Sequence, residues 1–250
     1  MLGSWTRINA AGMTCPDYPL CRGRFIPAFA GGTVWEWTHR LMAVLLCAVV
    51  IALLAAAWRR RKEAPFVPAL AAVVALLFAV QVALGALTVH LANSPASVVW
   101  HWGTAMAFAG TLTAMTIAAR TTSPHIGADY RLAWVLWIVA AIAFITMCIG
   151  AYVSASGAGL ACVSIPGCAG NVVVYTHGQY VQMVHRFAAA ICLLSAAAVA
   201  ALSWVWGANV RTKAAVGCGL VFIFLQVLLG LMNVALRLPM ELREAHAANA

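Results

Sequence analysis

Six long apolar runs constrain the fold of this chain more than any other feature. Each has about 20 residues or more, the length that an α-helix needs to cross the hydrocarbon core of a bilayer. They are rich in Ala, Leu and Val and lack the period-2 alternation of membrane β-strands, which favours helices over a barrel. The expected spans are residues 35–58, 66–90, 98–119, 132–153, 179–206 and 214–237. The sequence therefore predicts an all-α membrane protein with six complete spans.

Charge supports this class and excludes others. Only 8% of the 250 residues are charged, against about 25% in soluble domains, so soluble and disordered chains are excluded. The net charge of +9 could suggest nucleic acid, but basic loops beside spans explain it better, and we expect the lipid bilayer and no nucleic acid as partner. The basic residues expected on the cytoplasmic side are Arg59, Arg60, Arg61, Lys62, Arg120, Arg131, Arg211 and Lys213.

Two pairs of cysteines lie in the loops expected on the opposite, extracytoplasmic side. Cys15 and Cys21 share one loop, Cys162 and Cys168 share the other, and five residues separate the members of each pair. Disulfides persist outside the cytoplasm, so we favour two short disulfides. A zinc site with help from His177 is the alternative, although zinc thiolates are usually separated by two to four residues.

The chain also contains an internal repeat with an offset of 145 to 147 residues. Matching segments are 2–15 with 149–162, 36–40 with 182–186, and 81–85 with 226–230. A complete span precedes the cysteine loop in the second copy, and a complete span follows His101 in the first, so the natural unit has four helices.

The repeat predicts the domain organisation. Because four is an even number, both copies should cross the membrane in the same direction. We expect a tandem repeat of two four-helix transmembrane bundles, residues 1–124 and 125–250, with the first and the last helix missing from this chain.

Four histidines obey the repeat: His39 pairs with His185, and His101 with His246. All four lie at or near the outer ends of expected helices, where an ionisable group inside a span is usually functional. In each copy, the two imidazoles could ligate the iron of a haem from opposite sides. The alternative is that each histidine lies at the headgroup boundary and bonds to water or a carbonyl.

One polar position breaks the symmetry between the copies. Glu36 lies three residues before His39 on the same helix face, whereas its repeat partner is Gln182. This difference suggests that the first site needs a charge or a proton acceptor and the second needs only hydrogen bonding. Alternatively, Glu36 is simply ion-paired with Arg40. Arg40 and Arg186 could reach haem propionates, or could extend along the interface.

These motifs together resemble the haem A synthase family over essentially the whole chain. The residues that carry the resemblance are the loop string Gly12-Met13 with Cys15-Pro16-Asp17-Tyr18-Pro19-Leu20-Cys21-Arg22-Gly23, the motifs Glu36-x-x-His39-Arg40 and Gln182-x-x-His185-Arg186, and His101 with His246.

The resemblance implies an eight-helix fold and oxidation of a haem O methyl group to the formyl group of haem A by successive hydroxylations. It implies that His185 and His246 ligate a haem b cofactor, and that His39 and His101 mark the site that receives haem O. It also assigns Glu36 a role in stabilising a reactive intermediate or in moving protons. The paired loop cysteines match one branch of the family.

The resemblance further implies a bacterial inner membrane location, with the cysteine loops and both haem sites toward the extracytoplasmic side. A haem O synthase is expected to deliver the substrate, and the product serves terminal oxidase assembly. The electron donor stays unassigned, and association into a homo-oligomer stays open. Relative to the family, the chain is expected to lack the first and eighth helices, which would leave His246 on a short segment.

Two other functional classes compete with this interpretation. A dihaem b-type membrane cytochrome would use the four histidines as axial ligands and pass electrons without modifying haem. It would have no need of a carboxylate such as Glu36 in only one copy. A transporter is less well supported, because no span is broken by Pro or Gly pairs at mid-depth.

Overall fold

The computed structural model describes residues 2–120, 130–168, 170 and 173–250, and within these ranges the regular structure is helical apart from a bridge between Cys21 and Arg24. This confirms the all-α class. The chain divides into two compact units, residues 2–125 (the N-terminal unit) and residues 126–250 (the C-terminal unit). The boundary expected between residues 124 and 125 lies outside the described residues.

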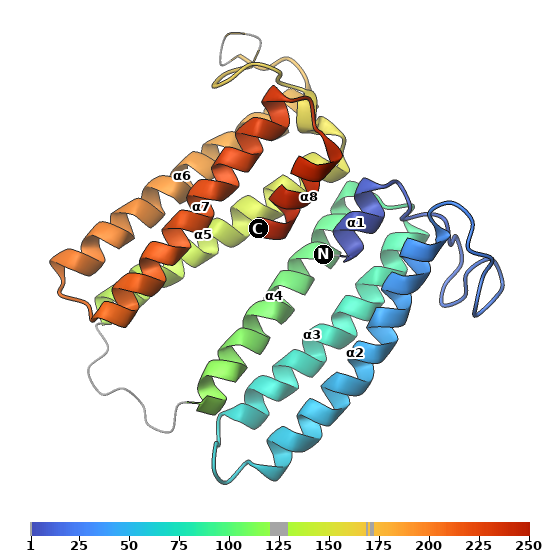
Figure 1. Ribbon diagram of the computed structural model, residues 1–250, viewed down its shortest axis with the longest axis horizontal. Helices are drawn as coiled ribbons and strands as arrows, with labels where there is room; N and C mark the ends of the chain where they lie inside the picture. The colour runs from blue at the N-terminus through green and yellow to red at the C-terminus, as the bar shows by residue number, and fades with distance from the viewer. Residues whose placement is uncertain (1, 121–129, 169, 171–172) are drawn as a thin grey trace. The chain divides into compact units, whose positions relative to one another are not determined.

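The N-terminal unit contains four helices: α1 (Leu2–Ile8), α2 (Thr33–Arg59), α3 (Val67–His90) and α4 (Pro95–Arg120). Helix α3 packs against both α2 and α4, and the short α1 packs against the start of α2 (Figure 1). Their shared core contains Val50, Val74, Phe78, Phe108 and Met115. The core fixes the relative positions of α2 and α4, which carry His39 and His101.

The C-terminal unit contains α5 (Tyr130–Ala155), a short 3₁₀-helix η1 (Ala158–Leu160), α6 (His177–Val205), α7 (Val210–Ala235) and α8 (Met240–Asn249). Helix α6 packs against α5 and α7, and α8 folds back along α7 (Figure 1). Buried Val153, Ala158 and Val181 form a small core where α5, η1 and α6 meet. This core positions the second cysteine loop over the start of α6.

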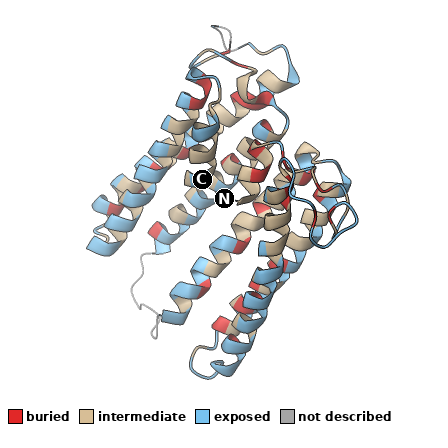
Figure 2. Cartoon of the chain, turned by 45° about the vertical axis from the view of Figure 1, so that its right-hand side comes forward, coloured by how far each residue is buried: buried red, intermediate tan, exposed pale blue. Residues whose placement is uncertain are grey.

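Five of these helices, α2, α3, α5, α6 and α7, are long and apolar enough to cross a membrane. Exposed residues follow their flanks (Figure 2), and they include large apolar side chains such as Val44, Leu76, Leu194 and Phe222. Lipid tails are the environment in which such faces are stable. The chain is therefore a multi-pass membrane protein.

The sequence predicted six membrane spans, but only five of the described helices are long and apolar enough to be candidate spans. The sixth segment, residues 98–119, forms most of α4, which has 26 residues and is long enough to span. It is not among the five helices that meet the criterion, because His101, Gly103 and Thr104 near its start and three further threonines reduce its apolarity.

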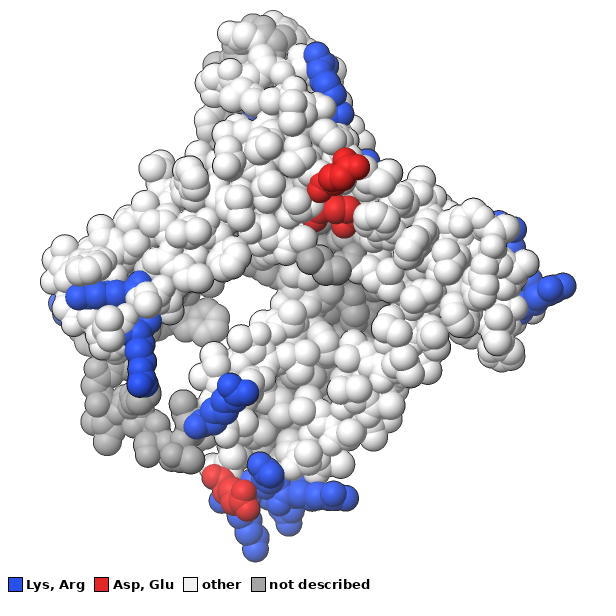
Figure 3. All heavy atoms as spheres, in the orientation of Figure 1, with Lys and Arg blue, Asp and Glu red and all other residues white. Residues whose placement is uncertain are grey.

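Charged side chains lie mainly in loops and at helix ends. In the face shown in Figure 3, Lys and Arg gather at the tips of the helices, and the flanks between them carry almost no charge. The basic run from Arg59 to Lys62 directly follows α2, and Arg211 with Lys213 begins α7. This distribution is typical of helices whose middles contact lipid.

Local sequence signals define where α6 begins. The Thr176 hydroxyl accepts a hydrogen bond from the Gln179 main-chain N–H at 3.2 Å, and the Gln179 side-chain oxygen accepts one from the Thr176 N–H at 3.3 Å. This reciprocal capping box satisfies two main-chain donors at the start of the helix. It fixes the first turn of the helix that carries Gln182 and His185.

We expect Thr176→Ala to lower the free energy of unfolding by about 1 kcal/mol, because the cap is lost. Unfolding in mixed detergent micelles measures this change. Ser195→Ala is the matched control, since the exposed Ser195 hydroxyl bonds only the Ile191 carbonyl of its own helix. Equal stability of the two variants would contradict the role of the cap.

Candidate functional site

Both expected disulfides are confirmed. Cys15 is bonded to Cys21, and Cys162 to Cys168, and all four residues are almost completely buried. Because these sulfurs are bonded to each other, they offer no thiolates to a metal. Within the described residues, no group of three or more His, Cys, Asp and Glu side chains is placed to hold a metal ion. The alternative of a zinc site in the loops is therefore wrong.

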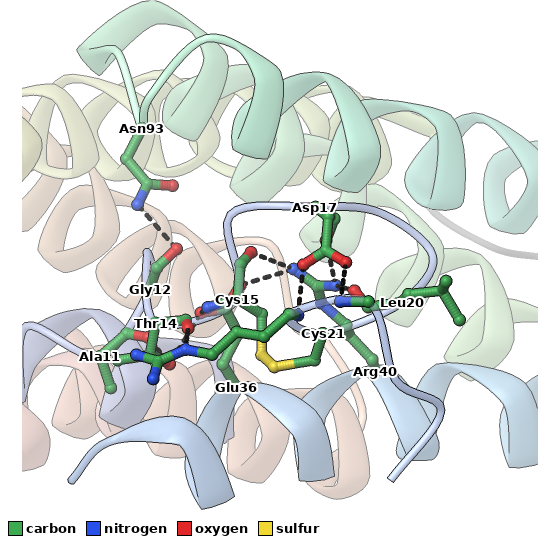
Figure 4. Close-up of polar contacts among 12 residues, drawn as sticks. Ala11, Gly12, Thr14, Cys15, Asp17, Leu20, Cys21, Glu36, Arg40 and Asn93 are labelled. Atoms are coloured by element: carbon green, nitrogen blue, oxygen red, sulfur yellow. Dashed lines mark hydrogen bonds and ion pairs between the residues drawn. A yellow bond between two sulfur atoms is a disulfide. The ribbon is translucent and has the colours of Figure 1, made fainter. Parts of the chain in front are cut away.

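An arginine near the start of α2 holds the first disulfide loop. The Arg40 guanidinium donates hydrogen bonds to the main-chain carbonyls of Cys15 at 2.7 Å, Asp17 at 2.6 Å and Leu20 (Figure 4). Its charge strengthens each of these bonds. One side chain thus anchors the whole Cys15–Cys21 ring to the helix that carries His39.

Asp17 stabilises the tip of the same loop. Its carboxylate accepts hydrogen bonds from the main-chain N–H groups of Gly23 at 2.7 Å and Arg22 at 2.5 Å. The Gly23 bond is the main cause that lowers the pKa of Asp17 below its ordinary value. The loop therefore keeps these bonds at neutral pH and loses them only in acid, when the carboxylate is protonated.

Glu36 lies beneath the loop and is 4% exposed. One carboxylate oxygen accepts from the Cys15 N–H at 2.8 Å and the Thr14 hydroxyl at 3.0 Å (Figure 4). The other is 2.7 Å from a guanidinium nitrogen of Arg40. The Glu36–Arg40 ion pair that the sequence offered as an alternative is therefore present, and it belongs to the loop anchor.

The second loop is held in a similar way by a neutral side chain. The Gln182 oxygen accepts from the Cys162 N–H at 2.5 Å, and its amide nitrogen donates to the Gly159 carbonyl at 2.7 Å. Arg186 donates to the carbonyls of Cys162 at 2.6 Å and Ser164 at 2.7 Å, and also to those of Pro166 and Gly167.

A carboxylate and an amide are not equivalent in this position. A carboxylate cannot donate a hydrogen bond, so Glu36 cannot bond the Gly12 carbonyl as Gln182 bonds the Gly159 carbonyl. Asn93 from the α3–α4 turn donates to the Gly12 carbonyl instead, at 3.0 Å (Figure 4). The repeat had not identified Asn93, whose counterpart 145 residues later is Leu238. Leu238 packs beside Gly159 as an apolar side chain.

The N-terminal unit brings His39 and His101 together. The centroids of their rings are 6.4 Å apart and the ring planes are almost perpendicular, at 89°. Two imidazole nitrogens that each bond one metal at about 2 Å place the ring centroids roughly 6 Å apart. The separation therefore fits a single iron between the two rings.

Gln81 is a further polar contact of this histidine pair that the motifs had not indicated as functional. Its amide nitrogen is 3.3 Å from Nε2 of His101. Because an amide nitrogen donates, Nε2 is the accepting nitrogen and Nδ1 carries the proton in this arrangement. The signal that could have found Gln81 is its repeat match with Gln226.

In the C-terminal unit, His185 lies on α6 and His246 on α8. Gln226 of α7 donates to the His246 main-chain carbonyl at 3.0 Å and accepts from the Asn249 amide at 2.7 Å, and both bonds help to hold α8 on α7. The Nδ1 atoms of both histidines are buried and make no hydrogen bond of normal geometry. Imidazoles are common axial ligands of haem iron, so the residue type fits this role.

The remaining described histidines lie apart from these pairs. His90 ends α3 and is exposed, and His177 begins α6 at the loop surface, with Nε2 3.4 Å from the Tyr152 hydroxyl. The structure thus brings His39 and His101 together, places His185 and His246 on two helices of the other unit, and leaves these two histidines elsewhere.

Known proteins share sequence similarity with this chain over most of its length. The model of the COX15-CtaA family, described as cytochrome oxidase assembly protein, matches residues 26–250. The chain belongs to this family. One relative is the heme A synthase of Shouchella clausii, which is 32% identical over 187 residues, or 71% of this chain and 62% of the relative. Another is the heme A synthase of Bacillus pumilus, which is 29% identical over 203 residues, or 75% of this chain and 64% of the relative. The heme A synthase of Bacillus licheniformis is 26% identical over 268 residues (98% and 84%).

The matched part of this COX15-CtaA chain thus spans 62% and 64% of the length of the first two of these relatives. The shared region includes both histidine motifs, Glu36-x-x-His39 and Gln182-x-x-His185, because the family model begins at residue 26.

We expect Arg186→Lys to loosen the second disulfide loop. A lysine ammonium cannot reach four carbonyls at once, and each lost charge-assisted bond costs about 1.5–3 kcal/mol. Main-chain amides of residues 161–168 should then exchange hydrogen at least about tenfold faster, as measured by mass spectrometry. Arg211→Lys at the start of α7 is the control, and equal loop exchange in both variants would contradict the anchor.

Proposed function

We propose that this chain is a haem A synthase, which oxidises a methyl group of haem O to the formyl group of haem A. The main support is the combination of family membership with the His39–His101 pair, whose rings are 6.4 Å apart. The named relatives are heme A synthases, and the alignment with one of them covers 98% of this chain.

In this proposal the two units are repeats of a four-helix bundle with different tasks, residues 1–124 for the substrate and residues 125–250 for the cofactor. His39 and His101 receive haem O, and His185 and His246 ligate haem b. Haem b, when bound, supplies a one-electron redox centre. Matching loop anchors support the repeat: Arg40 and Arg186 each bond the carbonyls of a disulfide-closed loop.

Glu36 provides the chemical difference between the two sites. Its negative charge lies one helical turn from His39, whereas Gln182 is neutral at the matching place beside His185. We infer that Glu36 holds charge or accepts a proton beside the substrate, and at the same time positions Cys15 and Thr14 through the bonds described above. Arg40 and Arg186 place a positive charge at each site, where haem propionates would be stabilised.

The charge distribution supports an orientation. Basic residues follow α2 and begin α7, and both disulfide loops lie at the other ends of these units' helices. We propose that the basic ends are cytoplasmic and that the loops and both histidine pairs face the extracytoplasmic side of a bacterial inner membrane. Haem O would then be delivered within the membrane by a haem O synthase.

Oxidase activity can be tested by expressing the chain in a host that makes haem O and separating the extracted haems by chromatography. The wild-type chain should produce haem A. His39→Ala and Glu36→Gln should lower the yield at least about 100-fold, because a ligand or a proton-handling group is lost. His90→Ala, which alters an exposed histidine outside both pairs, should leave the yield unchanged. Wild-type haem A production by both site variants would refute the catalytic assignment.

The cofactor assignment makes a separate prediction. His185→Ala should abolish the low-spin spectrum of a haem with two histidine ligands, because one axial bond is lost. His39→Ala should preserve that spectrum while it stops haem A formation. An unchanged spectrum in His185→Ala, at equal chain abundance, would refute the ligand assignment. If the chain were instead a dihaem electron carrier, two bound haems would be found and no haem A.

A further inference from the structure

Each of the four paired histidines packs against a glycine of the preceding helix. If a Cβ atom were added to these glycines, its nearest contact would in every case be Cε1 of the histidine ring. The pairs and distances are Gly3 with His39 at 3.1 Å, Gly85 with His101 at 3.1 Å, Gly150 with His185 at 2.7 Å, and Gly230 with His246 at 3.2 Å.

The distance of 2.7 Å at Gly150 is shorter than real Cβ atoms show, and the distances of 3.1–3.2 Å at the other three glycines are tight for a Cβ atom. Carbon atoms in favourable contact are about 3.5–4.0 Å apart, so an alanine at Gly150 would force His185 or the helix itself to move. Glycine is unfavourable inside a helix compared with alanine. Its presence at all four places is explained by the close approach of a ring to the helix backbone.

The atom Cε1 lies between the two ring nitrogens, and both nitrogens are close to the same added Cβ position. Nδ1 and Nε2 are 3.6 Å and 3.9 Å from it at Gly85, 3.3 Å each at Gly150, and 3.7 Å and 3.5 Å at Gly3. The Cε1 edge of the ring therefore faces the helix backbone, and this contact limits how far the ring can turn.

We propose that Gly85, Gly150 and Gly230 are positioning residues for the axial histidines, with Gly3 giving the same clearance to His39. The missing side chain lets the Cε1 edge of each ring lie against the helix backbone, and this close contact fixes the direction of the ring nitrogens. Surrounding groups that fix the orientation of a metal-bound histidine strengthen metal binding. The inference rests on the proposed haem ligation.

The chain supplies matched controls for this proposal. Gly217 and Gly219 lie on α7, the same helix as Gly230, and an added Cβ at either position would meet nothing within 4 Å. Alanine at these positions changes helix propensity in the same way but leaves every histidine untouched. Differences between the two sets of variants therefore report on the histidine contact.

The test measures bound haem b per chain, the low-spin electron paramagnetic resonance signal and the midpoint potential in the purified, full-length chain. Gly150→Ala should lower haem b affinity about 10- to 100-fold, the range known for groups that orient metal ligands. Gly230→Ala should retain part of the haem with an altered low-spin signal and a shifted midpoint potential, because the added Cβ turns the His246 ring away from its position. Gly217→Ala and Gly219→Ala should match the wild type.

Wild-type affinity, signal and potential in both Gly150→Ala and Gly230→Ala would overturn the inference while haem ligation itself stood. If Gly150→Ala does not accumulate, Gly230→Ala decides, since its added Cβ would meet the ring at the larger distance of 3.2 Å. A merely structural role would lower the amount of chain without changing the signal or potential of the haem that remains. Absence of low-spin haem from the wild-type chain would overturn both the proposed function and this inference.

Discussion

Main-chain carbonyls of a loop that packs against a helix need hydrogen-bond donors, and in each unit one partly buried arginine supplies them. Arg40 and Arg186 each bond several carbonyls of a loop closed by a disulfide. An unpaired carbonyl in an apolar environment is costly, so the loops depend on these side chains. The same helical turns carry His39 and His185, and thus the loop anchors and the histidine sites share one set of helix positions.

The difference between Glu36 and Gln182 affects both the hydrogen bonding of the loops and the charge beside the histidines. Both side chains accept a hydrogen bond from a cysteine N–H, so both serve the loops. Only the carboxylate brings a charge, which pairs with Arg40 and leaves the Gly12 carbonyl to Asn93. A structural task and a chemical task are therefore compatible in one residue, and a Glu36→Gln variant separates them because it keeps the acceptor and removes the charge.

The positions of the long helices could be predicted from the sequence, since each observed bound lies within a few residues of an expected one. α3, for example, was expected at residues 66–90 and is Val67–His90. The contacts of Arg40 could not be predicted, because its spacing from Glu36 fits an ion pair and its charge also fits a haem propionate. Only the folded loop shows that its donors contact the carbonyls of Cys15, Asp17 and Leu20.

By itself, the sequence determined the helical membrane class, the cysteine pairs and the set of four repeated histidines. These features depend on the length of apolar runs and on spacing along the chain, which are local properties. Tertiary structure alone decided that Gly150 faces His185 and that Gln81 contacts His101. Such contacts depend on how closely two helices approach and on how they are rotated, and both result from side-chain packing across the whole interface.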